Sequence, residues 1–174
     1  APVEKKVLSI LVFVGGADMH TVQPRILKAL YGTRDRLDIT VVSPEVVRSN
    51  KVIDGHKVSV QPLTDNIASL YSAADAIICG GGVTKYEAGY CVIPNACISQ
   101  TAEQDEDTQI VASSGLTFDL GLASQLSTCS SHLTSELETF LAPSERKRQK
   151  RLMRDNFCTE SAHNLAQKLV SLEI

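Results

Sequence analysis

The residues with the clearest chemical potential are the three consecutive glycines from Gly80 to Gly82, with Thr84 and Glu87 shortly after them. They follow the apolar run 76–79, which is typical of a buried strand, and precede a segment with helical periodicity. Backbone N–H groups at such a turn are available to an anion, and a helix dipole favours negative charge there. We expect Thr84 to add a hydroxyl to a bound phosphate and Glu87 to accept hydrogen bonds from a ribose.

The same glycines also fit a second interpretation, in which they serve a tight turn or close packing of a helix against a sheet. The common nucleotide motifs do not decide between the two. No glycine follows Gly82 at the spacing of the dinucleotide fingerprint, and no Gly-Lys-Ser/Thr of a P-loop occurs. Both interpretations therefore stay open at the level of this motif alone.

Two further polar loops leave strand-like runs. Residues 15–20 follow the apolar run 7–14, and residues 99–104 follow the run 95–98. In open α/β sheets, ligands bind beyond the carboxyl ends of the strands. We therefore expect these two loops and the glycine stretch to meet in one site.

Strand-like runs alternate with helical segments along the whole chain. The strands are expected at residues 7–14, 37–42, 58–60, 76–79, 95–98 and 116–118. This alternation predicts an α/β fold, a doubly wound, Rossmann-like parallel sheet of about six strands. A chain of 174 residues fits one domain, so residues 1–174 are expected to form a single domain.

The composition excludes several classes of protein. A net charge of −3 gives no reason to expect nucleic acid as a partner, and no apolar run reaches the roughly 18 residues of a membrane span. Five cysteines without a Cys-x-x-Cys spacing predict free thiols in a reducing, cytoplasmic setting and give no ligand spacing for a metal. No cofactor is expected. The chain does not begin with Met, so it is expected to be part of a longer polypeptide.

Three segments together resemble a known pattern: residues 13–18, residues 71–87, and residues 93–95 with 101–104. They resemble the carboxyl-terminal half of GT-B-fold nucleotide-sugar proteins. The nearest likeness is to the UDP-sugar hydrolases of pseudaminic acid biosynthesis and the related spore-coat polysaccharide biosynthesis proteins. The likeness spans about the first two-thirds of the chain and implies a UDP-sugar as ligand.

The resemblance also implies a set of ligand-binding residues. The glycine loops would hold the pyrophosphate, Glu87 the ribose, and the Gln104 region the sugar. The implied set is Gly15, Gly16, Asp18, Gly81, Gly82, Thr84, Glu87, Glu103 and Gln104. Asp18 fits a helix cap as well as a ligand contact. Two positions depart from the family, since Val83 stands where Ser is frequent and Glu103 where Asn is usual.

Catalysis is expected to need a second half. In the hydrolases that the chain resembles, the general base lies in the amino-terminal half, which would have to be supplied in cis or in trans. His20 is the one His near the expected site and is a weak candidate for a base, because a loop His is more often simply solvated. A paired hydrolase or glycosyltransferase-like enzyme, a binding module without catalysis, and a small α/β protein for another phosphorylated ligand all remain open. The basic run 146–154 is either a solvated helix face or a partner surface.

Overall fold

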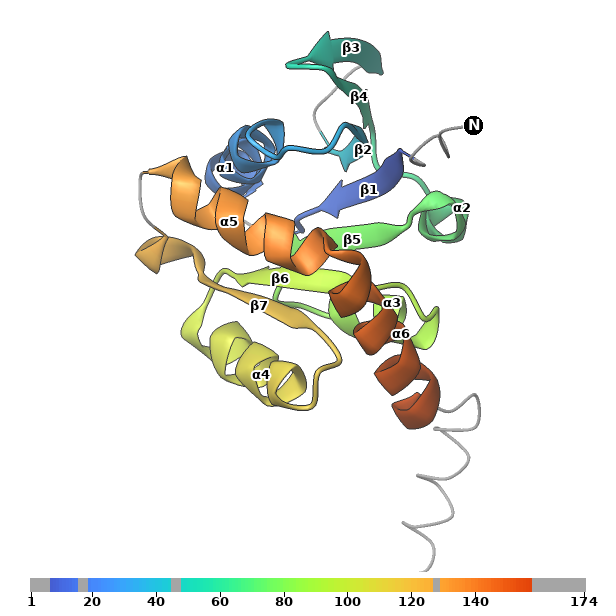
Figure 1. The fold of residues 1–174 in the computed structure, drawn as a ribbon, viewed down its shortest axis with the longest axis vertical. Coiled ribbons are helices and arrows are strands. Elements are labelled where there is room, and N and C mark those ends of the chain that lie inside the picture. Colours follow the sequence, from blue (N-terminus) through green and yellow to red (C-terminus); the bar gives the residue numbers. More distant parts are fainter. Residues whose placement is uncertain (1–6, 16–18, 45–47, 127–128, 158–174) are drawn as a thin grey trace, which may run out of the picture.

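The computed structural model describes residues 7–15, 19–44, 48–126 and 129–157, which form a sheet with helices on both faces (Figure 1). The strands are β1 (Leu8–Phe13), β2 (Leu37–Val42), β3 (Ser49–Ile53), β4 (His56–Gln61), β5 (Ala76–Gly80), β6 (Asn95–Ser99) and β7 (Phe118–Leu122). The helices are α1 (Met19–Tyr31), α2 (Ile67–Ala73), α3 (Thr84–Tyr90), α4 (Ala102–Ser113), α5 (Ser130–Leu141) and α6 (Pro143–Asn156), and a short 3-10 helix, η1, spans Ala123–Gln125.

The sheet has the order β3-β4-β2-β1-β5-β6-β7. All neighbouring strands from β4 to β7 pair in parallel. The predicted α/β fold with a doubly wound parallel sheet is therefore confirmed. After β1 the chain first builds the sheet on one side, through β2 and β4, and then on the other, through β5, β6 and β7. The point where this order reverses lies between β1 and β5.

The edge of the sheet differs from the prediction. Only a short strand was expected at residues 58–60, whereas the structure has a hairpin in which β3 runs antiparallel to β4. Asp54 and Gly55 form its turn with φ values of 49° and 85°. Positive φ at both central residues is the geometry of the tight hairpin turns that Asp-Gly favours. The sheet therefore has an antiparallel edge strand in addition to the parallel ones.

The last strand begins later than expected. Residues 116–118 were predicted to form it, but β7 starts at Phe118. Gly115 has φ 72°, and the Leu116 N–H donates to the carbonyl of Val111. This is the hydrogen-bonding pattern that ends a helix with a left-handed glycine, so residues 115–116 complete α4 instead of opening the strand.

Alternate residues of the central strands pack into two apolar layers, as expected for strands buried on both faces. Ile10 and Ile78 face a large core shared with α1 and α5. Leu11 and Ile77 face a smaller core on the opposite side, shared with α2 and α3. In Figure 1, α5 lies across one face of the sheet and α6 extends beyond the strands. Among the described helices, none is long and apolar enough to cross a membrane.

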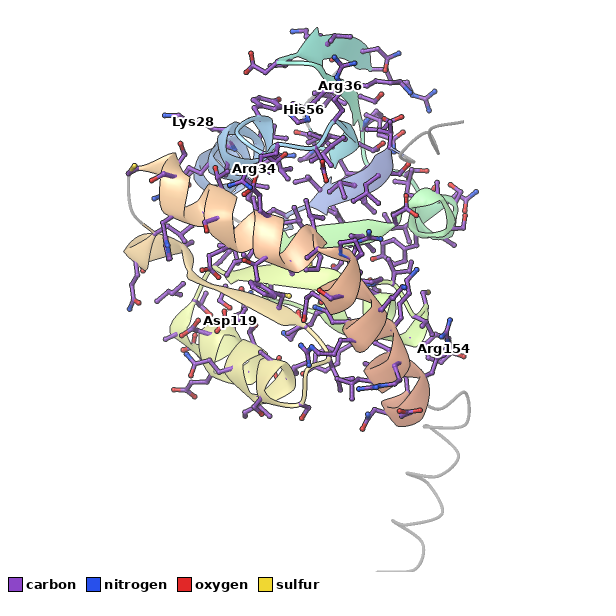
Figure 2. The ribbon with its side chains drawn as sticks, viewed as in Figure 1. Lys28, Arg34, Arg36, His56, Asp119 and Arg154 are labelled. Atoms are coloured by element: carbon purple, nitrogen blue, oxygen red, sulfur yellow. The ribbon has the colours of Figure 1, made fainter. Side chains whose placement is uncertain are left out.

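A buried histidine holds the hairpin to the rest of the fold. The Leu37 N–H donates to Nδ1 of His56 at 3.2 Å, and Nε2 of His56 lies 3.3 Å from the carbonyl of Tyr31. Figure 2 shows His56 beside α1. With Nδ1 accepting, Nε2 carries the proton and donates to Tyr31, so both ring nitrogens are satisfied in the neutral form. His56 is therefore a structural residue that connects β4 to β2 and α1.

Candidate functional site

The candidate site lies where the strand order reverses, at the carboxyl ends of β1, β5 and β6. A cavity of about 220 Å³ opens there. Its lining comes from all three loops that the sequence singled out: Gly15, Gly80, Gly82, Val83, Thr84, Gln100 and Gln104. In doubly wound sheets, this position at the switch point is where ligands bind. The fold therefore brings the loops after β1, β5 and β6 together.

The three consecutive glycines, Gly80 at the end of β5 and Gly81 and Gly82 in the β5–α3 loop, differ in what a side chain would meet. A Cβ at Gly80 would lie 2.9 Å from Nε2 of Gln100, and one at Gly81 would lie 2.9 Å from both Cβ of Gln104 and Oγ of Ser99. Gly81 is therefore required by packing, whereas at Gly80 the close atom is the end of the flexible Gln100 side chain, which can move. At Gly82, a Cβ would meet nothing within 4 Å, and φ lies outside the left-handed region. Neither packing nor backbone conformation within the described structure requires a glycine at position 82.

Backbone N–H groups in this loop lack partners. Within the described ranges, the N–H groups of Gly82, Val83 and Thr84 donate to no protein acceptor, whereas those of Tyr86 and Glu87 donate to the Val83 carbonyl. Backbone donors are nearly always satisfied by protein, water or ligand. Helix α3 has only seven residues, so its dipole is small, and the chemical feature of this loop is the run of consecutive N–H groups.

Gln100 is a site residue that the sequence interpretation missed. Its side-chain Nε2 donates to the carbonyl of Gly15, which joins the loop after β6 to the loop after β1. Its backbone N–H donates to Oε1 of Gln104 at 3.0 Å. The side-chain oxygen of Gln104 is thus bonded within the protein, and its side-chain NH₂ group is available to the cavity that Gln104 lines. In the sequence, the feature that could have indicated Gln100 is its position directly after the buried strand β6.

Glu87 lies one turn along α3 from Thr84 and does not line the cavity. Its Oε2 accepts a 2.7 Å hydrogen bond from the hydroxyl of Tyr71, a residue of α2 that is 4% exposed. Burial raises the pKa of Tyr71, and the hydrogen bond to Glu87 raises it further. The Tyr71 hydroxyl therefore stays protonated and holds the carboxylate of Glu87 in one orientation, one helical turn from Thr84.

The remaining predicted residues divide into two groups. Glu103 is exposed in the first turn of α4, where hydrogen bonds from its own backbone N–H and from Thr101 lower its pKa, so its carboxylate is turned to its own helix. Gly16 and Asp18 lie outside the described residues, and so does the side chain of His20. Across the described ranges, no three His, Cys, Asp or Glu side chains converge in a way that would hold a metal ion.

A larger cavity, about 560 Å³, lies at the other end of the parallel strands, where their amino ends are. Its lining includes Leu8 at the start of β1, Pro143 at the start of α6, and the charged residues Asp35, Arg36 and Arg146. Doubly wound folds bind their ligands at the carboxyl ends of the strands and not at this amino end. Its acidic and basic side chains also give it no single charge preference.

No family model matches the chain. A search of curated proteins finds a UDP-N-acetylglucosamine–N-acetylmuramyl-(pentapeptide) pyrophosphoryl-undecaprenol N-acetylglucosamine transferase of Geotalea uraniireducens (strain Rf4). That protein is 33% identical over an alignment of 90 residues, which covers 48% of this chain and 25% of the transferase. This alignment establishes a local likeness to a glycosyltransferase.

Solved structures match over nearly the whole chain. MurG of Acinetobacter baumannii matches with a TM-score of 0.78 and 17% identity, over 98% of this chain and 51% of that one. The spinosyn rhamnosyltransferase SpnG matches with a TM-score of 0.65 and 15% identity, over 88% and 42%. SnogD of Streptomyces nogalater matches with a TM-score of 0.56 and 20% identity, over 98% and 45%.

These matches establish the fold. It is the carboxyl-terminal, Rossmann-like half of GT-B glycosyltransferases, as the sequence predicted. The chain spans about half the length, or less, of the structures that it matches. The narrower likeness to UDP-sugar hydrolases of pseudaminic acid biosynthesis stays a prediction, as does the assignment of individual ligand-binding residues.

Proposed function

We propose that the chain binds the diphosphate of a UDP-sugar in the 220 Å³ cavity at the carboxyl ends of β1, β5 and β6. The observation that carries this proposal is the run of N–H groups at Gly82, Val83 and Thr84, which have no acceptor within the described protein. At Gly82, in addition, a side chain would face open space. Consecutive free N–H groups form a cradle that suits phosphate oxygens. Gly82 then serves the close approach of the ligand to the backbone.

We assign the nucleoside to the side of the cavity next to α3, where Glu87 lies one helical turn beyond Thr84. Glu87 is exposed there, and Tyr71 fixes one of its carboxylate oxygens. A fixed carboxylate accepts hydrogen bonds from the two hydroxyls of a ribose. Uracil is proposed as the base because the curated protein that resembles this chain is named for UDP-N-acetylglucosamine.

The same geometry suggests what the site does in a reaction. When the bond between a sugar and a nucleoside diphosphate breaks, negative charge develops on the departing phosphate. Backbone N–H groups already aimed at that oxygen stabilise the charge without reorganisation. The chain thus supplies the leaving-group side of a sugar transfer or hydrolysis. An amino-terminal half, in cis or in trans, supplies the acceptor side and the general base.

Isothermal titration calorimetry with UDP, UMP and uridine tests the proposal. We expect UDP to bind at least about 10-fold more tightly than uridine, because each charge-assisted hydrogen bond contributes ~1.5–3 kcal/mol. ADP serves as the control for base recognition. Equal affinities for uridine and UDP would refute a diphosphate site. Equal affinities for ADP and UDP would favour the alternative, a site for another phosphorylated ligand.

The assignment of the general base to an amino-terminal half is tested by following UDP release from UDP-sugars. The chain alone is expected to release almost none, because a positioned acid or base typically contributes ~10²–10⁴-fold and is assigned to the other half. Adding a GT-B amino-terminal half is expected to produce activity. Robust release by the chain alone that disappears in His20→Ala would show that this chain is a complete enzyme.

A further inference from the structure

Lys85 is a fully buried lysine directly behind the glycine loop. Its side chain is 0% exposed, and lysine is almost never buried in this way unless its charge is satisfied. The Nζ atom donates to the carbonyls of Gly81 and Gly82, the latter at 3.2 Å, and forms a 2.7 Å ion pair with Oδ2 of Asp107. These three acceptors use the three N–H donors of the ammonium group.

The two carbonyl contacts determine where the loop directs its N–H groups. The described chain has no cis peptide bond, and in a trans peptide the C=O and the following N–H point in opposite directions. Because the carbonyls of Gly81 and Gly82 turn toward Lys85, the N–H groups of Gly82 and Val83 turn away from it. These are two of the N–H groups that lack an acceptor. A hydrogen bond to a cation also polarises each peptide and makes its N–H a stronger donor.

Asp107 of α4 holds the ammonium in place. Its second oxygen, Oδ1, accepts a 2.6 Å hydrogen bond from the hydroxyl of Tyr86, and the Nζ atom of Lys85 lies 5.0 Å from the centre of the Tyr86 ring. The Lys85 ammonium lowers the pKa of Asp107, and the bond from Tyr86 lowers it further. The carboxylate is therefore charged at neutral pH, and the β5–α3 loop is tied to α4 through a satisfied charge pair.

We propose that Lys85, held by Asp107, is a positioning residue that directs the Gly82 and Val83 N–H groups toward a bound diphosphate without touching it. This inference rests on the proposed function of the cavity. It adds that affinity for the diphosphate depends on a cation on the far side of the loop. The nucleoside, in contrast, is recognised independently of Lys85.

The test measures UDP and uridine binding by calorimetry in wild-type protein and in Lys85→Met, which keeps an unbranched side chain one heavy atom shorter and removes the charge. We expect UDP affinity to fall ~10-fold or more and uridine affinity to stay within about 2-fold, because only the diphosphate contacts are lost. Lys147→Met, at an exposed lysine of α6, is the matched control and should bind both ligands as the wild type does. Thermal unfolding shows whether each variant is folded.

A second variant covers the case in which Lys85→Met does not fold. Asp107→Asn keeps the ammonium but removes its charged partner, and we expect an approximately 3-fold or larger loss that is confined to UDP. Equal losses for UDP and uridine, or unchanged UDP binding in a folded variant, would overturn the positioning role. Wild-type protein that does not distinguish UDP from uridine would instead overturn the proposed function, and this inference with it.

Discussion

Replacing Gly82 by alanine separates ligand binding from folding. A Cβ at this position meets no protein atom within 4 Å, so the substitution leaves packing unchanged. We expect the free energy of unfolding to stay within ~0.5 kcal/mol of the wild type or to rise slightly, because alanine restricts the unfolded chain more than glycine does. The side chain would instead occupy space in the cavity that Gly82 lines.

The expected loss of affinity follows from contact distances. A phosphate oxygen that accepts from a backbone N–H comes within about 2.9 Å of the nitrogen. A methyl carbon needs about 3.5 Å to an oxygen, so a Cβ that projects from Gly82 into the cavity would occupy space that the proposed phosphate needs and would push it out of reach of part of the loop. Losing one charge-assisted hydrogen bond costs ~1.5–3 kcal/mol. UDP affinity should therefore fall roughly 10- to 150-fold in Gly82→Ala.

Gly81→Ala is the matched control for this experiment. Its Cβ would lie 2.9 Å from Cβ of Gln104 and from Oγ of Ser99, so it should destabilise the protein by ~1–3 kcal/mol through overpacking. Calorimetry measures UDP binding, and chemical denaturation measures stability. A Gly82→Ala variant that binds UDP as tightly as the wild type would refute the claim that this loop contacts the diphosphate.

Three further variants test other parts of the account. Glu87→Gln should weaken UDP binding by ~1–3 kcal/mol, as expected for hydrogen bonds to a charged group, and should not weaken binding of 2′,3′-dideoxy-UDP; equal losses for both ligands would exclude a ribose contact. Gly89→Ala should destabilise the protein by ~1–3 kcal/mol in denaturation experiments, because its Cβ would lie 2.3 Å from Cζ of Phe157, and unchanged stability would show that this contact is not needed. Asp107→Asn tests the lowered pKa: the stability that the carboxylate contributes is present above its usual value of 3.8 and is lost as pH falls below it. The difference in Tm between wild type and Asp107→Asn should therefore shrink from about pH 7 to about pH 3, and a difference that persists in acid would contradict this ion pair.

The sequence predicted the parts of the fold that depend on local pattern. Apolar runs followed by glycines or polar loops identified the central strands and the three loops of the site, because a buried parallel strand must be apolar on both faces. The edge hairpin had a local signal as well, the Asp54-Gly55 turn, and it was overlooked because strand β3 (Ser49–Ile53) carries little apolar pattern.

Contacts between distant segments could not be inferred in the same way. Gln100 bonds to Gly15, 85 positions earlier, and no feature of the loop 99–104 indicates that partner. Lys85 is a stronger case, because lysine in a helix is expected at the surface. Its burial depends on the carbonyls of the preceding turn and on Asp107, which belongs to another helix. Such roles depend on how the elements pack, which single-sequence patterns do not encode.

The central claim is that the N–H groups of the β5–α3 loop bind a diphosphate, and amide NMR tests it most directly. In a titration of ¹⁵N-labelled protein, UDP should shift the N–H signals of Gly82, Val83 and Thr84 more than most others, and uridine should leave these three nearly unchanged. Shifts that are the same for UDP and uridine would contradict the account. So would UDP shifts concentrated around Arg36 and Arg146, in the cavity at the amino ends of the parallel strands.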